Sequence, residues 1–118
     1  MVVIEGKRGQ FMDISLEGWD IVRADEAEWV PWGGTGDARA KVLGSADGYV
    51  VVLVEAQPGY RGDAHEHAHA EFFYLIDGTI QNQGVGLKTG DGYAAAAGSS
   101  HTDFSTDSGA TYIITFKL

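Results

Sequence analysis

The chain has no cysteine among its 118 residues. Disulfide bonds, thiolate zinc sites and cysteine nucleophiles are therefore excluded. Basic residues are also scarce: eight lysines and arginines stand against seventeen acidic residues, which gives a formal net charge of −9. Nucleic acids and anionic membrane surfaces both require a basic protein surface, so this balance argues against either partner.

Long apolar runs are missing as well. No run approaches the roughly 20 residues that a membrane-spanning helix needs. Residues Met1 to Gln10 lack the charged-then-apolar pattern of a secretory signal, so we expect a cytoplasmic protein. The length fits a single domain over residues 1–118, with residues 1–16 as an N-terminal arm or edge strand.

Proline is rare, with two residues, whereas seventeen glycines separate many short apolar runs. This pattern is typical of short strands joined by turns, and it predicts an all-β sandwich or barrel with almost no helix. The strongest strand pattern is Tyr49 to Glu55, a continuous β-branched run that we expect to be covered on both faces.

A second strong strand is predicted over Glu71 to Ile76. Because alternate side chains of a strand point to opposite faces, Phe73 and Leu75 should face the interior. The other face should pack under another segment or in a dimer contact, and it carries Phe72, Tyr74 and Ile76. Asp77-Gly78 then predicts a hairpin turn into a strand over Thr79 to Gln83.

Three of the four histidines fall within the heptapeptide His65-Glu66-His67-Ala68-His69-Ala70-Glu71. In an extended strand, residues 65, 67, 69 and 71 project from one face. Such a set of polar groups needs a partner, and a divalent metal suits imidazole and carboxylate ligands. Two alternatives remain open at this point: a water-facing segment without a ligand, and a helix that places His67 and Glu71 at i, i+4.

The spacing of residues around this heptapeptide resembles the first motif of the cupin family. The matching residues are Gly59, His65, His67, Glu71 and Gly78. The second cupin motif is matched at Gly90, Gly98 and His101, whereas its proline and asparagine positions hold Ala96 and Ser105. The chain therefore resembles a small single-domain, RmlC-like cupin of the metal-binding type, with the likeness covering residues 49–116.

The resemblance implies a double-stranded β-helix, or jelly-roll barrel, with one divalent metal ion inside. Iron is the preferred ion, and zinc, manganese, nickel, cobalt and copper are alternatives. The ligands carried over are His65, His67, Glu71 and His101, which would leave one or two positions of an octahedral ion open. A site that uses the three histidines without Glu71 is also conceivable.

His69 shares the parity of the expected ligands but has no place in the motif. We expect it beside the metal or at the mouth of the cavity, rather than as a ligand, and it is the candidate proton-transfer group. The three tryptophans are expected as core or interface aromatics: Trp19, Trp29 and Trp32. Other side chains that could approach a bound ligand are Tyr60, Gln81, Gln83, Phe104 and Tyr112.

Small cupins with this pattern look most like non-haem iron dioxygenases that act on diketones, phenolic acids or thiol acids. The first hypothesis is therefore a metal-dependent enzyme with a small-molecule substrate. A non-catalytic metal-binding or ligand-sensing module is the second, and a metal-assisted sugar isomerase or epimerase is the third. By analogy with cupins, we also expect a homodimer in which the segment Met1 to Leu16 covers a partner, because exposed sheet edges invite pairing.

Overall fold

The structure is a computed structural model that describes residues 2–3 and 14–118, so most of the expected N-terminal arm lies outside the described residues. The described part is almost entirely β-structure, with one 3₁₀ turn, η1, at Ala24–Glu26. This confirms the predicted all-β class. The strands are β1 (Val2–Val3), β2 (Ile14–Ser15), β3 (Val30–Pro31), β4 (Ala38–Ala46), β5 (Tyr49–Ala56), β6 (His65–Glu66), β7 (Glu71–Asn82), β8 (Val85–Lys88), β9 (Gly92–Ala95), β10 (Ser100–His101), β11 (Phe104–Ser105) and β12 (Ala110–Lys117).

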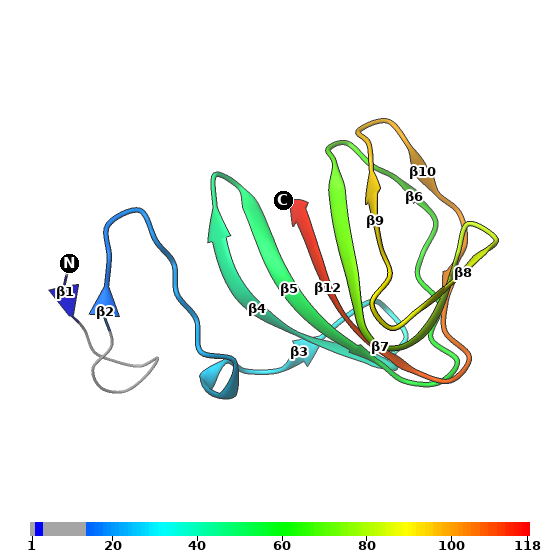
Figure 1. Cartoon of the computed structure of the whole chain (residues 1–118), viewed down its shortest axis with the longest axis horizontal. Coiled ribbons are helices and arrows are strands. Elements are labelled where there is room, and N and C mark those ends of the chain that lie inside the picture. Colours follow the sequence, from blue (N-terminus) through cyan, green and yellow to red (C-terminus); the bar gives the residue numbers. More distant parts are fainter. Residues whose placement is uncertain (1, 4–13) are drawn as a thin grey trace.

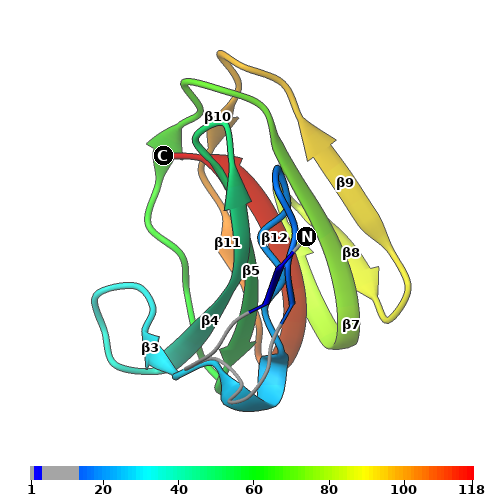
Figure 2. The same cartoon turned by 90° about the vertical axis from the view of Figure 1, so that its left-hand side faces the viewer.

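Eight of the strands form an antiparallel sheet in the order β11-β7-β12-β5-β4-β3, with β8 and β9 also paired to β7, whereas β1 pairs with β2 and β6 pairs with β10. The sheet curls strongly, so that β8 and β9, together with the pair of β6 and β10, come to face the layer of β4, β5 and β12 (Figures 1 and 2). The long strand β7 joins the two layers. Its first half pairs with β9 and β12, and its second half pairs with β8 and β11. The architecture is that of a jelly-roll barrel.

The hairpin predicted at Asp77-Gly78 is wrong, because β7 runs through both residues without a turn. Gly78 instead allows a close approach of two strands: its φ is +99°, and a Cβ there would collide with the carbonyl oxygen of Gly109. The turn lies further on, at Gln83 and Gly84, which both have positive φ and connect β7 to β8. Consecutive positive φ values are typical of two-residue hairpin loops.

The core fills the space inside the curled sheet with alternate side chains of each strand. Phe73 and Leu75 are 5% and 0% exposed, which confirms the predicted inner face of β7. The inward-facing residues of β5 and β12 complete this layer: Val50, Val52, Val54, Tyr112 and Ile114. The outer face of β5 is not fully covered, since Val51 is 37% exposed, so the expectation that both faces are buried is wrong.

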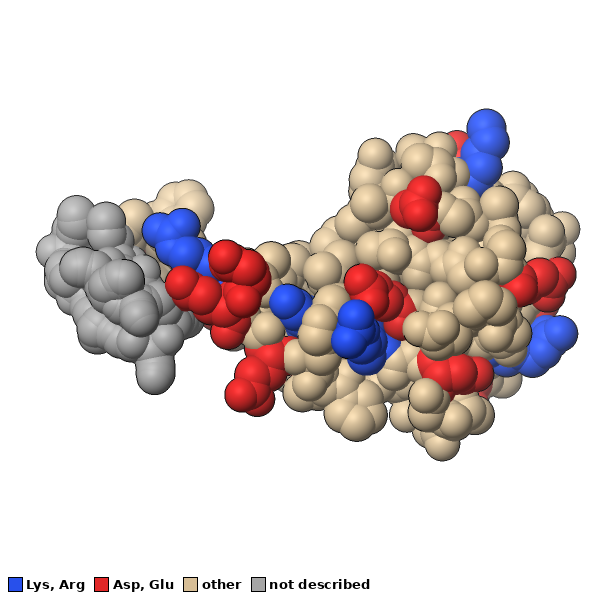
Figure 3. All heavy atoms as spheres, turned by 90° about the horizontal axis from the view of Figure 1, so that it is seen from below, with Lys and Arg blue, Asp and Glu red and all other residues tan. Residues whose placement is uncertain are grey.

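The outer face of the molecule carries charges of both signs. Figure 3 shows acidic side chains spread over the lower face, with single lysines and arginines between them rather than a basic patch. Within the described residues, no helix is long and apolar enough to cross a membrane.

Candidate metal centre

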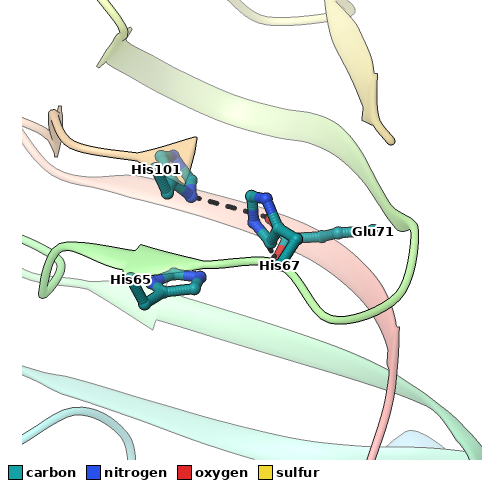
Figure 4. Close-up of side chains that lie close together, drawn as sticks. All are labelled: His65, His67, Glu71 and His101. Atoms are coloured by element: carbon teal, nitrogen blue, oxygen red, sulfur yellow. Dashed lines mark ion pairs between the residues drawn. The ribbon is translucent and has the colours of Figure 1, made fainter. Parts of the chain in front are cut away.

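Four side chains from three strands and one connection converge inside the barrel (Figure 4). They are the four residues that the two motifs predicted, and one ligand atom from each lies within 4.8 Å of the others: His65, His67, Glu71 and His101. His67, Glu71 and His101 are buried, whereas His65 is exposed at the edge of the cluster. Three imidazoles and one carboxylate so close together could hold a divalent ion.

The backbone brings the histidines together through a short antiparallel pair. In this pair β6 and β10 place His65 directly opposite His101, and their ring centroids are 5.3 Å apart. His67 follows β6 and continues the pairing, because its N–H donates to the carbonyl of Ser99 and its carbonyl accepts from Gly98. The cluster therefore depends on the contact between two segments that are distant in the sequence.

The geometry differs from the extended strand that suggested the site. Strand β6 ends at Glu66 and β7 begins at Glu71, with a bend at Ala68 and His69 between them. This bend breaks the alternation of side chains, so His69 is exposed and does not belong to the cluster. A role for His69 in proton transfer stays a prediction.

Hydrogen bonds fix the orientation of the first two imidazoles. His65 Nδ1 lies 2.9 Å from the carbonyl oxygen of Asp63, which can only accept. His67 Nδ1 lies 2.9 Å from Ser99 Oγ, whose own proton is donated to the carbonyl of Ala96 at 2.7 Å. Both rings therefore carry the proton on Nδ1 and present the lone pair of Nε2 to the cluster.

The third imidazole is oriented the other way round. His101 Nε2 lies 2.6 Å from Asn82 Oδ1, so this nitrogen donates and Nδ1 faces Glu71 at 3.9 Å from Oε2. Burial lowers the pKa of His101, and the neighbouring rings of His65 and His67 lower it further, although the charge of Glu71 opposes the shift. A lowered pKa keeps the ring neutral, which is the form that binds metals.

One buried atom of the cluster lacks a partner. Among the described residues, His67 Nε2 is the only buried side-chain nitrogen or oxygen without a hydrogen bond, and it lies 3.2 Å from Glu71 Oε1. Leaving a buried polar atom unpaired is costly, so such atoms need a specific explanation. A divalent ion held by His67 and Glu71 would give this nitrogen a partner. The residues present therefore fit such an ion.

Glu71 is held by a residue that the sequence did not single out. The hydroxyl of Tyr93 donates to Glu71 Oε2 at 2.6 Å, and the Tyr93 ring stacks on Phe73 with a centroid separation of 4.7 Å. Burial raises the pKa of Tyr93, and the hydrogen bond to Glu71 and the charge of that residue raise it further. Tyr93, Ser99 and Asn82 all belong to the site through pairing of distant segments, and no spacing motif marks them.

The cluster borders a cavity of about 400 Å³. Its wall is formed by three of the four clustered residues together with aromatic and apolar side chains: Trp32, Gly33, Tyr60, Gly62, Asp63, His65, Glu71, His101, Phe104, Tyr112, Ile114 and Phe116. Tyr60, Phe104 and Tyr112 were expected near a bound ligand. Gln81 and Gln83 do not line this cavity, whereas Trp32, expected as a core or interface aromatic, does so and also packs against the core.

The comparison with known sequences agrees with the two motifs. Residues 18–117 match the ChrR cupin-like domain family. The pectin degradation protein KdgF of Dickeya dadantii (strain 3937) is 32% identical over 93 residues, which are 74% of this chain and 84% of that protein.

Solved structures show the same fold at lower sequence identity. An acetylacetone dioxygenase from Acinetobacter johnsonii superposes with a TM-score of 0.68 at 14% identity, over 97% of this chain and 77% of that one. A chain of the Rhodobacter sphaeroides complex of SigE with the anti-sigma ChrR gives 0.67 at 18% identity, over 80% of this chain and 52% of that one. The present chain thus spans about half of that chain. The family match and the shared barrel together show that the chain belongs to the ChrR cupin-like domain family of the cupins.

Proposed function

We propose that the protein is a metal-dependent enzyme of the non-haem iron dioxygenase type, which acts on a small organic substrate inside the barrel. The observation that carries this proposal is the position of three of the four clustered side chains, His65, Glu71 and His101, at the wall of an aromatic cavity of about 400 Å³. A cavity of this size can enclose a small molecule, and largely apolar walls with a few convergent polar groups are typical of ligand sites.

In this proposal His65, His67, Glu71 and His101 hold the ion. A bound divalent metal would polarise substrate oxygens as a Lewis acid, and iron would add one-electron chemistry with dioxygen. The chain's own contribution is orientation. The hydrogen bonds to the imidazoles fix which nitrogen faces the ion, and aromatic side chains line the cavity in which the substrate would lie.

The charges that line the cavity limit the charge of the substrate that can bind there. The residues lining it, all in the described part of the chain, include no lysine or arginine, and Asp63 adds a carboxyl group. An anionic group on the substrate would therefore lack a protein counter-ion and could be neutralised only by the metal. This favours an uncharged molecule, or one whose anionic oxygens bind the metal directly. The similarity to an acetylacetone dioxygenase supports a diketone.

The experiment is elemental analysis of protein purified without added metal, alongside the His101→Ala variant. We expect near-stoichiometric iron in the wild type and its loss in the variant, since His101 supplies one of the four ligand atoms. Oxygen uptake with acetylacetone then tests the reaction, with Val85→Ala on β8 as a control that leaves metal and uptake unchanged. Oxygen uptake absent from the iron-loaded protein, with a panel of diketones and phenolic acids, would contradict the dioxygenase.

A second candidate is a non-catalytic module that binds a metal or small ligand. The match to the ChrR cupin-like domain favours it, since ChrR is an anti-sigma protein. Stoichiometric zinc in the purified protein, with no exchangeable water on a substituted cobalt ion, would support this candidate against the first.

A third candidate is a metal-assisted sugar isomerase or epimerase. The identity of 32% to a pectin degradation protein favours it. Such a reaction needs a general base beside the metal, and His69 is our candidate despite its exposed position. Isomerisation of a sugar that His69→Gln slows, while metal content stays constant, would support this candidate.

A further inference from the structure

We propose that Tyr93 is a positioning residue that limits Glu71 to one metal-binding oxygen, and thereby sets how many coordination positions stay open for substrate. The inference rests on the metal site of the proposed function, but it does not depend on which reaction the site performs. It concerns the different roles of the two oxygens of the Glu71 carboxylate.

The two oxygens of Glu71 have different surroundings. Oε2 accepts the hydrogen bond from the Tyr93 hydroxyl at 2.6 Å and lies 3.9 Å from His101 Nδ1. Oε1 has no such donor and lies 3.2 Å from His67 Nε2, the buried nitrogen that lacks a partner. Oε1 is therefore the oxygen that is turned toward His67 and available to bind an ion with it, while Oε2 already accepts a short hydrogen bond.

Tyr93 can hold this position because its ring is fixed on several sides. Strand β9 pairs with β7 so that Tyr93 lies opposite Phe73, and the two rings stack at an angle of 5°. The ring also meets His101 edge-on, with centroids 6.0 Å apart. Gly92 brings the two strands close, since a Cβ there would lie 2.6 Å from the carbonyl oxygen of Phe73.

The hydroxyl also keeps its proton. A tyrosine hydroxyl ionises only near a pH of about 10. Tyr93 is therefore a donor to Oε2 at ordinary pH. Its hydrogen bond takes up one of the two lone pairs of Oε2 and holds the carboxylate in the rotation that turns Oε1 toward His67.

The consequence concerns the free positions on the ion. Three imidazole nitrogens and one carboxylate oxygen leave about two positions of an octahedral ion open, whereas both carboxylate oxygens would leave about one. A substrate that binds through two oxygens needs both positions. Tyr93 would thus decide whether a chelating substrate can bind without displacing a protein ligand.

The test is Tyr93→Phe in protein loaded with Mn²⁺, with water-proton relaxation as the measure of water molecules on the ion. The substitution keeps the ring stack and removes only the hydroxyl. We expect the relaxation enhancement per bound ion to fall about two-fold, because Glu71 would bind through both oxygens and displace one of about two waters. Tyr74→Phe is the matched control. Because Tyr74 lies on the exposed face of β7, this substitution should leave the relaxation enhancement unchanged.

A double variant guards against an indirect effect of Tyr93→Phe on folding. The amide of Glu71→Gln has one oxygen, so adding it to Tyr93→Phe should restore the relaxation enhancement of the wild type. Equal enhancement in Tyr93→Phe and the wild type, with Mn²⁺ bound to both, overturns the role of Tyr93 alone. Failure of the wild type to bind any divalent metal overturns the metal centre, and the proposed function falls with it.

Discussion

Ser99 Oγ lies 2.9 Å from His67 Nδ1 and, because it donates its own proton to Ala96, it can only accept from the imidazole. The serine therefore selects the tautomer that presents Nε2 to the other clustered side chains. We expect Ser99→Ala to weaken divalent metal binding by about 10-fold to 100-fold, as is usual when a hydrogen bond to a metal-binding histidine is lost. Competition with a chromophoric chelator measures the affinity.

Ser108→Ala is the control for Ser99→Ala. Its hydroxyl bonds Thr79 at 3.0 Å in an exposed position, on the far half of β7 from Glu71. The two serine variants remove the same group, so equal affinities for metal would show that the orientation of His67 does not depend on Ser99.

The close approach at Gly78 predicts a large loss of stability on adding a methyl group. Gly78→Ala combines an unfavourable φ of +99° with a collision against the backbone of Gly109. We expect the free energy of unfolding to fall by about 3 kcal/mol or more. Gly90→Ala has nearly the same φ, +96°, but no heavy atom within 4 Å of the added carbon, so it should cost about 1 to 2 kcal/mol. Denaturant titration compares them, and equal losses would rule out a steric role for Gly109.

Buried tyrosines predict a loss of stability at alkaline pH. Burial raises the pKa of Tyr112 well above its ordinary value, and burial also raises the pKa of Tyr93. The unfolded chain ionises its tyrosines near pH 10, so above that pH the folded state binds more protons than the unfolded state. The contribution of these tyrosines to the free energy of unfolding is thus fully present below about pH 10. Above that pH, each such tyrosine lowers the free energy of unfolding by up to about 1.4 kcal/mol per pH unit.

Denaturant titrations from about pH 8 to about pH 11, with tyrosinate absorbance recorded in parallel, measure this effect. Tyr112→Phe should show a shallower dependence on pH, because one of the shifted groups is gone. Full ionisation of every tyrosine near pH 10 in the folded protein would contradict the prediction.

The exposed face of β7 gives the expected homodimer a specific test. Phe72, Tyr74 and Ile76 are 49%, 51% and 41% exposed, and the neighbouring strand β12 places Ile113 beside Tyr74. Apolar side chains gathered in this way are typical of an interface. Tyr74→Glu should therefore lower the mass measured by sedimentation from that of a dimer to that of a monomer. Val85→Glu, at a residue 58% exposed on β8, should not. A wild type that sediments as a monomer at every concentration tested would contradict the expected dimer.

Motif spacing was sufficient to predict the four clustered residues. His65, His67 and Glu71 belong to one short segment, and His101 was assigned from the second motif although it lies in a different strand. The all-β fold could also be predicted, because glycine-separated apolar runs leave few alternatives. The parity argument for the first segment was wrong in detail, since the bend at Ala68 and His69 interrupts the strand.

Contacts set by strand pairing could not be predicted in the same way. Tyr93 reaches Glu71 only because β9 pairs with the start of β7, and Asn82 reaches His101 only because β7 continues to residue 82. The second motif expects an asparagine at Ser105, a buried residue that pairs with Gln81 instead. The hydrogen-bonding amide at His101 comes from Asn82, and a motif read along one segment does not identify a partner on another.

Both ends of strand β7 therefore contribute a residue that lies beside His101. The strand begins with Glu71 and ends with Asn82, the residue that orients His101. An insertion or deletion of one residue between them would swap inward and outward side chains along the rest of the strand. The carboxylate and the amide would then no longer serve the same histidine. We expect relatives that keep this centre to differ in the identity of residues within β7 but not in their number, whereas the turn at Asp47 and Gly48 can change length freely.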